Sequence, residues 1–252
     1  MSISERFREL HQPGRPLILP NAWDYCSAAA LVAEGFPAIG TTSLGVSAAA
    51  GVPDAAGATR AETIDLARKL ARLPVPITVD IEAGFGDAPE VAHELAEAGI
   101  AGVNVEDGRG SELADPNTQA ELIAAIKSRT PPLFVNARVD THWLGLHHDS
   151  TIDRMRRYEK AGADGLFVPG VRDPAEIARL VKTTALPLNV LYLPGGPSVR
   201  ELAAQGVARI STGGLLFRAA VAATVDTARA IRDNLPTPPN IPTYARIQNL
   251  VN

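Results

Sequence analysis

The sequence predicts an α/β fold of the (β/α)8 TIM-barrel class. Eight short runs of β-forming apolar residues recur along the chain, and helical patterns fill most of the intervals. Glycine marks the junctions at similar places in several of these units. The chain has 252 residues with 46% hydrophobic content, which is the size of one such barrel. We therefore expect residues 1–252 to form a single domain.

The eight expected strands share an apolar body that ends in polar residues. They cover residues 16–22, 38–43, 77–82, 102–107, 133–140, 165–170, 187–192 and 207–213. The stretches between them are rich in Ala, Leu, Glu and Arg, which favour helix, and the clearest cover 61–73, 89–98, 118–127, 152–161 and 175–183. Strands that alternate with helices in this way pair in parallel.

Glycine closes four of the expected helices. Gly35, Gly99, Gly162 and Gly206 each follow a helical stretch and precede a strand. Glycine adopts the left-handed conformation that ends a helix without a steric penalty. Four such endings indicate a repeated βα unit.

The end of the chain has a different character. Residues 236–242 are rich in proline, and residues 243–251 can form a short helix. We expect the 236–252 tail to leave the barrel and to pack on a neighbouring subunit.

Composition excludes several classes of protein. The net charge is −4 and no Lys/Arg block is dense, so we expect no nucleic-acid partner. The N-terminus lacks a signal peptide's apolar core, and no apolar run approaches the roughly 18–20 residues of a membrane span, so we expect a cytoplasmic protein without a membrane partner. The single cysteine, Cys26, excludes an intrachain disulfide and a cysteine-rich metal site.

Polar residues concentrate at the expected strand ends, whereas the strand starts are almost purely apolar. In barrels of this class the chemistry lies where the strands end. The polar residues there are Asn21, Asp24, Thr41, Thr42, Ser43, Asp80, Glu82, Glu106, Asp107, Asn136, Arg138, Asp140, Ser211 and Thr212.

Three of these carboxylates are candidate metal ligands. Asp80 and Glu82 are two residues apart, so on a strand they point to the same face, and Glu106 ends the next strand. Ligands that are mostly oxygen favour Mg²⁺, or Mn²⁺, over Zn²⁺. The alternative is that such acids cap the following helices, a role that suits Asp87 and Asp115.

Two further features can bind an anion. Arg138 lies inside an otherwise apolar strand, and a buried arginine needs a negative partner. That partner can be Asp140, the metal carboxylates or a substrate carboxylate, and one guanidinium can serve more than one of them. The backbone N–H groups of residues 41–45 could line an anion hole or form an ordinary turn.

Five segments resemble the isocitrate lyase/phosphoenolpyruvate mutase superfamily. They are residues 19–24, 40–43, 79–86, 103–107 and 136–140, and they fall in the superfamily's order at successive strand ends. The nearest branch looks like the small proteins named carboxyphosphonoenolpyruvate phosphonomutase-like. The resemblance implies a barrel whose last helix is swapped between subunits of a homodimer or homotetramer.

The resemblance also implies roles for single residues. Asp80 would bind Mg²⁺, and Glu82, Glu106 and Asp54 would reach the ion directly or through water. A 2-oxo carboxylate or its enolate would be the bound partner, with Arg138 on the developing oxyanion and the N–H groups of Ser43 and Leu44 beside it. The metal candidates are therefore Asp80, Glu82 and Glu106, the substrate-binding candidates are Thr42, Ser43, Leu44, Asp54, Asn136 and Arg138, and the catalytic candidates are Arg138, Glu106 and Arg109.

The chain departs from the superfamily pattern in two places. After the fourth strand, the carbon–carbon lyases have a gate with a catalytic cysteine and the phosphoryl enzymes have a loop with lysine. Residues 106–115 here have neither and are short, which leaves Arg109, Ser111 or Glu112 as proton donors. Glu82 stands where an aspartate is usual, so the metal shell would be one methylene wider.

These features predict a Mg²⁺-dependent lyase that acts on a small 2-oxo or 2-hydroxy (di)carboxylate through an enolate, by C–C cleavage or decarboxylation. One alternative is C–P chemistry on a phosphonopyruvate-like substrate, in which Arg109 replaces the missing lysine. Another is a 2-oxo acid binding protein that has lost turnover, which the short gate motivates.

Overall fold

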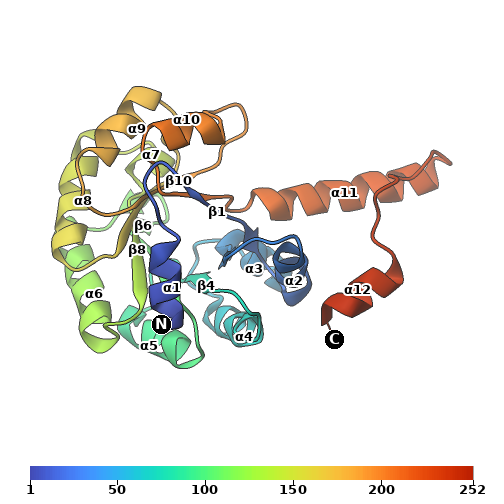
Figure 1. Ribbon diagram of the computed structural model, residues 1–252, viewed down its shortest axis with the longest axis horizontal. Helices are drawn as coiled ribbons and strands as arrows, with labels where there is room; N and C mark the ends of the chain where they lie inside the picture. Colours follow the sequence, from blue (N-terminus) through green and yellow to red (C-terminus); the bar gives the residue numbers. More distant parts are fainter. Residues whose placement is uncertain (252) are drawn as a thin grey trace.

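A computed structural model describes residues 1–251, and the chain folds as a parallel barrel ringed by helices (Figure 1). The sheet has nine strands in the order β1-β11-β10-β9-β8-β5-β4-β3-β2. Their bounds are β1 Leu17–Leu19, β2 Asn21–Ala22, β3 Ile39–Thr41, β4 Ile77–Asp80, β5 Gly102–Glu106, β8 Phe134–Arg138, β9 Gly165–Val168, β10 Leu188–Leu191 and β11 Arg209–Ser211. The predicted (β/α)8 class is confirmed.

The barrel closes through one predicted strand that is broken in two. Pro20 separates β1 from β2, because proline has no N–H to offer to a ladder. β1 pairs in parallel with β11, and β2 pairs in parallel with β3. The nine strands therefore correspond to the eight predicted segments, and all of them lie inside the predicted ranges.

The helices follow the strands around the outside. Their bounds are α1 Ile3–Glu9, α2 Tyr25–Ala33, α3 Ser43–Ala50, α4 Arg60–Leu70, α5 Ala88–Glu97, α6 Pro116–Arg129, α7 Thr141–Leu144, α8 Thr151–Lys160, α9 Pro174–Val181, α10 Val199–Ala204, α11 Leu215–Arg232 and α12 Tyr244–Val251. The five predicted helices are α4, α5, α6, α8 and α9. Asp87 and Asp115 cap α5 and α6, as their positions predicted, since the two side chains accept hydrogen bonds from N–H groups of the first turn.

Helix α1 covers the N-terminal end of the barrel. A capping box between Ser2 and Glu5 starts it. Phe7 is fully buried, and its ring meets Phe134 edge-on at 5.2 Å between centroids. The opposite end, where the strands finish, is therefore the open one.

The barrel has an apolar outer layer and a polar interior. Strand residues such as Val79, Val103 and Val135 are fully buried among the helices. Inside the barrel, Arg209 on β11 reaches across to hydrogen-bond with Asn104 on β5. Polar groups therefore line the interior just beneath the strand ends.

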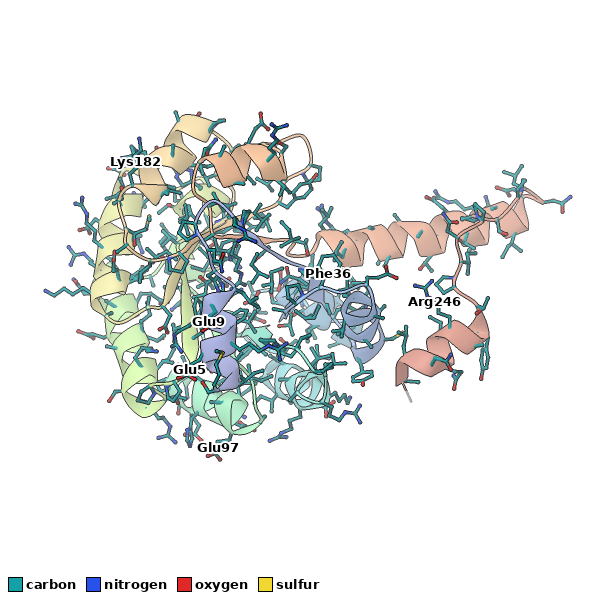
Figure 2. The ribbon with its side chains drawn as sticks, in the orientation of Figure 1. Glu5, Glu9, Phe36, Glu97, Lys182 and Arg246 are labelled. Atoms are coloured by element: carbon teal, nitrogen blue, oxygen red, sulfur yellow. The ribbon has the colours of Figure 1, made fainter. Side chains whose placement is uncertain are left out.

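The two last helices stand outside this ring. Helix α11 extends away from the barrel, and within residues 1–251 none of its side chains is buried (Figure 1). Helix α12, which carries Arg246 (Figure 2), returns toward α2. Arg246 donates to Glu34 at 2.7 Å. The chain leaves the barrel at α11, ahead of the expected 236–252 tail, and the packing of that tail on a neighbouring subunit stays a prediction.

The helices of the structure can be compared with the length and hydrophobicity of a membrane span. Across residues 1–251, no helix combines the length and apolar character that a bilayer crossing requires.

Candidate active site

A cavity of about 270 Å³ opens at the C-terminal ends of the strands. Its polar lining contains most of the predicted site residues, whereas the remaining wall is apolar. The polar side chains are Asn21, Thr42, Ser43, Asp54, Asp80, Asn104, Glu106, Arg138, Asp140, Tyr192, Ser211, Thr212 and Arg218, and the larger apolar ones are Leu44, Trp143, Leu144, Phe167, Pro169, Leu191, Leu193, Pro194 and Leu215.

Arg138, the last residue of β8, lies between two carboxylates. Its Nη1 lies 2.7 Å from Glu106 Oε2, and its Nε donates to Asp140 Oδ1 at 2.7 Å. The guanidinium also lies about 6 Å from the ring centroids of Trp143 and Phe167. The prediction that Arg138 has an anionic partner inside the protein is confirmed.

Asp80 and Glu106 end neighbouring strands, and Glu106 is buried while Asp80 is half-buried. The Thr41 hydroxyl accepts the N–H of Asp80 at 2.9 Å, which fixes the strand end. Burial raises the pKa of Asp80, and Arg138 opposes that rise. Burial, together with the nearby charges of Asp80 and Asp140, raises the pKa of Glu106 to about 8. Burial is the main cause of both raised values, and repulsion among the carboxylates adds to it. The cavity lining also contains more acidic than basic side chains, so negative charge is in excess there.

This charge excess and the oxygen donors fit a hard divalent cation. Mg²⁺ is commonly bound by one or two carboxylates, with water and substrate oxygens completing its shell. Asp80 and Glu106 supply such a pair. Within the described residues, no cluster of three or more Asp, Glu, His or Cys side chains forms a complete cation cage.

Glu82 occupies a different position from the one its spacing predicted. Strand β4 ends at Asp80, and Glu82 has a positive φ of 50°, so the alternation of a strand does not extend to it. Its carboxylate accepts hydrogen bonds from the Gly57 N–H at 2.9 Å and the Thr59 hydroxyl at 3.1 Å. The expectation of one shared strand face for Asp80 and Glu82 is wrong. In this structure Glu82 holds the loop that carries Asp54 to the cavity.

Thr42, Ser43 and Leu44 line the cavity as the start of α3. Thr42 is the N-cap, and Ser43 and Leu44 are the first two helical residues. Backbone N–H groups in the first turn of a helix have no partner inside that helix, and the helix dipole favours negative charge there. The predicted segment therefore lines the cavity together with Asp54 and Asp80, and anion binding by its N–H groups stays a prediction.

Asn104, and not the predicted Asn136, lines the cavity. Asn136 is 1% exposed, and its side chain donates to Asn104 Oδ1 at 2.8 Å. Asn104 on β5 lines the cavity, while Asn136 supports it from β8. Sequence reasoning chose Asn136 because it lies in the segment with Arg138. The signal for Asn104 was available, since it precedes Glu106 by two residues and so shares its face.

Arg109 has a structural role in the short loop after β5. This loop forms a hairpin of β6 (Gly108–Arg109) and β7 (Glu112–Leu113). Arg109 Nη1 donates to the carbonyls of Glu106 and Gly108 at 2.8 and 2.7 Å, and Nη2 donates to Gln119 at 2.9 Å. In the described chain the hairpin lines the cavity with Gly108 and Gly110 rather than Arg109.

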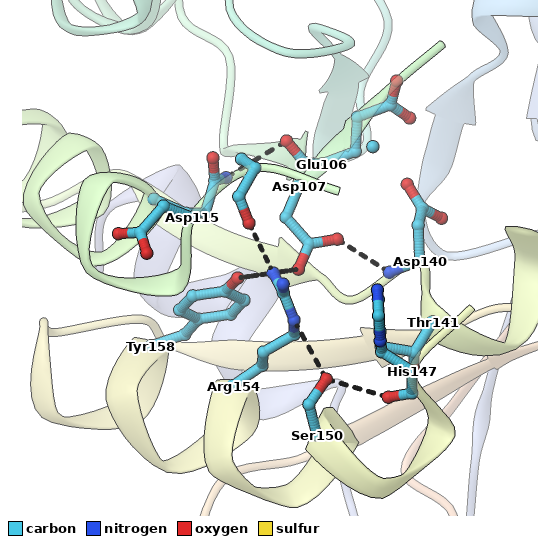
Figure 3. Close-up of polar contacts among 12 residues, drawn as sticks. Glu106, Asp107, Asp115, Asp140, Thr141, His147, Ser150, Arg154 and Tyr158 are labelled. Carbon is cyan, nitrogen blue, oxygen red and sulfur yellow. Dashed lines mark hydrogen bonds and ion pairs between the residues drawn. The ribbon is translucent and has the colours of Figure 1, made fainter. Parts of the chain in front are cut away.

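A buried network ties this hairpin to the strand that carries Arg138 (Figure 3). Asp107 is fully buried, and its carboxylate accepts the N–H of Asp140 at 2.8 Å, the Tyr158 hydroxyl at 2.7 Å and Arg154 Nη1 at 2.9 Å. Arg154 also donates to the Ala114 carbonyl at 2.9 Å. Helix α8 thereby positions both the hairpin and Asp140.

Several cavity residues were not predicted. Trp143 stands in α7 and Tyr192 just beyond β10, while Arg218 lies on α11 and is exposed at the cavity mouth. Arg218 lies in the first turn of α11, where no strand-end rule applies. The position of α11 relative to the barrel had to be known to find it.

Comparisons with known proteins agree with this geometry. Residues 7–232 match the model of the phosphoenolpyruvate phosphomutase family. An uncharacterized protein of Mycobacterium tuberculosis is 48% identical over 245 residues, covering 96% of this chain and 94% of that protein. A 2-methylisocitrate lyase of Bacillus subtilis is 33% identical over 74% of this chain and 66% of its own length. An oxaloacetate decarboxylase of Ectopseudomonas mendocina is 34% identical over 74% of this chain and 69% of its own length.

Solved structures show the same architecture. A candidate lyase/mutase of Burkholderia cenocepacia superposes with a TM-score of 0.90 at 34% identity, covering 99% of this chain and 95% of the other. A phosphonopyruvate hydrolase in complex with oxalate and Mg²⁺ has a TM-score of 0.86 at 26% identity, covering 100% of this chain and 95% of the other. The chain therefore belongs to the phosphoenolpyruvate phosphomutase family, within the isocitrate lyase/phosphoenolpyruvate mutase superfamily.

Proposed function

We propose that this protein is a Mg²⁺-dependent lyase that cleaves or decarboxylates a small 2-oxo or 2-hydroxy (di)carboxylate through an enolate. The observation that carries the proposal is the placement of Arg138, which lies between Glu106 and Asp140 in a cavity that Asp80 also lines. Relatives named 2-methylisocitrate lyase and oxaloacetate decarboxylase support this reaction class.

The charges in the cavity support a divalent cation. Four carboxylates, those of Asp54, Asp80, Glu106 and Asp140, line the cavity with the guanidinium groups of Arg138 and Arg218, and Arg209 lies beneath them, which leaves one excess negative charge. A divalent ion would make the net charge positive and so favour an anionic substrate. Asp80 and Glu106 are the residues that would hold Mg²⁺, with Mn²⁺ as the other candidate. The bound ion would polarise the carbonyl of a 2-oxo acid.

Backbone and side-chain groups of the protein bind the substrate, stabilise the oxyanion and exclude water. The N–H groups of Ser43 and Leu44 bind the substrate carboxylate at the start of α3. Arg138 stabilises the oxyanion that develops when the bond to the leaving carbon breaks, because its charge is held in place before the reaction. Phe167 and Leu191 exclude water from that oxyanion.

The cavity can also take a second carboxylate. Arg218 lies at its mouth, is exposed, and makes no ion pair with another described residue. An otherwise apolar wall with one free cation suits a dicarboxylate better than a tricarboxylate. This favours a substrate smaller than 2-methylisocitrate.

The C–P alternative has less support. It required Arg109 to take the place of a lysine, and the Arg109 guanidinium is occupied by backbone carbonyls and Gln119. The alternative of a silent binding protein predicts ligand binding without conversion, so an activity assay separates it from the lyase.

The test is release of pyruvate or carbon dioxide from a panel of 2-oxo and 2-hydroxy dicarboxylates, with Mg²⁺ and with EDTA. The proposal predicts turnover of at least one substrate with Mg²⁺, its loss in EDTA, and its loss in Arg138→Ala. Arg157→Met is the matched control, because Arg157 is an exposed arginine paired with Asp153. Phosphorus NMR with phosphonopyruvate tests the C–P alternative. Absence of turnover on every substrate would overturn the proposal.

We also propose that two or four copies assemble through α11. This helix exposes Val221 and Val225, and the chain beyond it exposes Leu235 and Ile241. An apolar face of this kind next to a barrel is typical of a covered surface. Sedimentation velocity should give a dimer or tetramer for the wild type and a smaller species for Val221→Asp/Val225→Asp. A wild-type monomer at micromolar concentration would contradict this.

A further inference from the structure

Asn104 forms part of the cavity floor. It lies on β5, two residues before Glu106, and pairs in register with Asp80 on one side and Asn136 on the other. It is 4% exposed and lines the cavity. A buried amide at the base of a polar cavity needs hydrogen-bond partners for both its oxygen and its nitrogen.

The orientation of the Asn104 amide is fixed by its neighbours. Oδ1 accepts from Asn136 Nδ2 at 2.8 Å and from Arg209 Nη2 at 3.3 Å. A guanidinium can only donate, so the group facing Arg209 must be the amide oxygen. Asn104 Nδ2 is therefore directed elsewhere, and within residues 1–251 it makes no hydrogen bond.

Arg209 is unusual among the described residues because its guanidinium is buried without an ion pair. It is fully buried inside the barrel, and it makes no ion pair with any described carboxylate. Its Nε donates to Ser211 Oγ at 3.0 Å, its Nη2 donates to Asn104, and its Nη1 has no partner among the described residues. The nearby charge of Asp80 favours the cation, but a buried arginine without a direct ion pair is costly, so a role is expected for it. Both side chains that it contacts, Asn104 and Ser211, line the cavity.

We propose that Asn104 is a substrate-binding residue whose amide N–H donates to an oxygen of the bound 2-oxo acid, and that Arg209 is the positioning residue that sets this orientation. The inference rests on the proposed function, because it concerns the same cavity. It adds a neutral hydrogen-bond donor on β5, two strands away from β3, which leads into α3. That donor selects for an oxygen acceptor at this position, and an alkyl group there would leave it unsatisfied.

The first test is the affinity for oxalate in the presence of Mg²⁺, measured by calorimetry. Asn104→Asp keeps an acceptor for Arg209 and removes the donor, and Asn104→Ala removes both. Each should weaken oxalate binding about 10- to 100-fold. Asn189→Asp is the control for the added charge. Asn189 lies on β10 opposite Arg209 of β11, it is buried as Asn104 is, and it does not line the cavity. The substitution introduces the same charge at similar depth, and it should change the affinity by less than about threefold.

The second test separates binding from mere support of the fold. The side-chain ¹⁵N–H₂ signals of Asn104, assigned by their loss in Asn104→Asp, should shift when oxalate and Mg²⁺ are added. In Arg209→Lys these signals should change without ligand, because the single ammonium no longer holds the amide as the guanidinium does. Unshifted Asn104 signals in a wild type that binds oxalate, or an Asn104→Asp variant that binds as the wild type does, would overturn the inference alone. A wild type that does not bind oxalate would overturn it together with the proposed function.

Discussion

Arg138 and Glu106 form an ion pair of 2.7 Å at the ends of adjacent strands, and both side chains are nearly closed to solvent. Glu106 and Arg138 lie directly opposite each other in the pairing of β5 with β8, so the strand pairing sets the distance between their side chains. Arg138 also holds Asp140, so its charge is shared between two carboxylates before any substrate binds. Such a preformed arrangement needs little reorganisation when an oxyanion develops.

Replacement of Arg138 should therefore affect catalysis and stability together. Arg138→Ala should lower kcat by at least about 10²–10³-fold, the effect of losing one oxyanion donor. It should also lower the free energy of unfolding by about 3–5 kcal/mol, since Glu106 and Asp140 would remain buried without their cation. Arg138→Lys should recover much of the stability and little of the activity, because lysine lacks the planar fork. Urea titrations and steady-state kinetics measure the two effects, and a fully active lysine variant would contradict the assignment.

The Asp107 network should be important for stability. Tyr158→Phe removes one hydrogen bond to a buried carboxylate and should lower the free energy of unfolding by about 1.5–3 kcal/mol. Arg157→Met, one residue away on the exposed face of α8, should change it by less than about 1 kcal/mol. Equal losses in the two variants, measured by urea denaturation, would show that Asp107 does not depend on Tyr158.

Glu82 and Asp80 should differ in their effects on metal binding. Asp80→Asn should abolish Mg²⁺ binding, because Asp80 faces the cavity. Glu82→Gln should leave Mg²⁺ affinity within about tenfold and instead raise KM, because its carboxylate holds Gly57 and Thr59 in the loop that carries Asp54. Titration with Mn²⁺, followed by electron paramagnetic resonance, reports on the ion directly. Loss of ion binding in Glu82→Gln would make Glu82 a ligand, as its spacing first indicated.

His11 should make stability depend on pH. Its ring stacks on Phe134, its Nε2 is out of contact with solvent, and burial with the nearby charge of Arg209 lowers its pKa to about 3. The unfolded chain takes up a proton near pH 6.5, so between these values it binds more protons than the folded chain. The contribution of the neutral His11 ring to the free energy of unfolding is fully present above about pH 6.5. Below that pH it falls by up to about 1.4 kcal/mol per pH unit.

The control for this effect is His11→Gln, which cannot titrate. Urea denaturation of both proteins from pH 7.5 to 5 should show a steeper loss of stability in the wild type. Parallel curves would mean that His11 takes up its proton at the same pH in the folded and unfolded chains, so that burial does not lower its pKa.

The fold could be read from the sequence because the signals repeat. Apolar strands, helix-capping acids such as Asp87 and Asp115, and glycine endings such as Gly99 all follow from local chemistry. The convergence of Asp80, Glu106 and Arg138 also followed, because strand ends in a barrel must meet.

The remaining site details depended on backbone geometry outside the strands. Glu82 leaves the strand pattern because its φ is positive. Arg109 turns back to its own hairpin because the carbonyls of Glu106 and Gly108 are within reach. Asn104 and Asn136 occupy equivalent register positions, and each precedes a site residue by two positions, so the lining of the folded cavity was needed to show that Asn104 faces it.

The central claim is that Asp80, Glu106 and Arg138 form a metal-assisted site for a 2-oxo acid or its enolate. The most direct measurement is calorimetric titration of oxalate into the wild-type protein, with Mg²⁺ and with EDTA, and into Asp80→Asn. We expect binding that requires Mg²⁺ and is absent in Asp80→Asn. Oxalate binding of equal strength in EDTA, or no binding to the wild type under either condition, would contradict the claim.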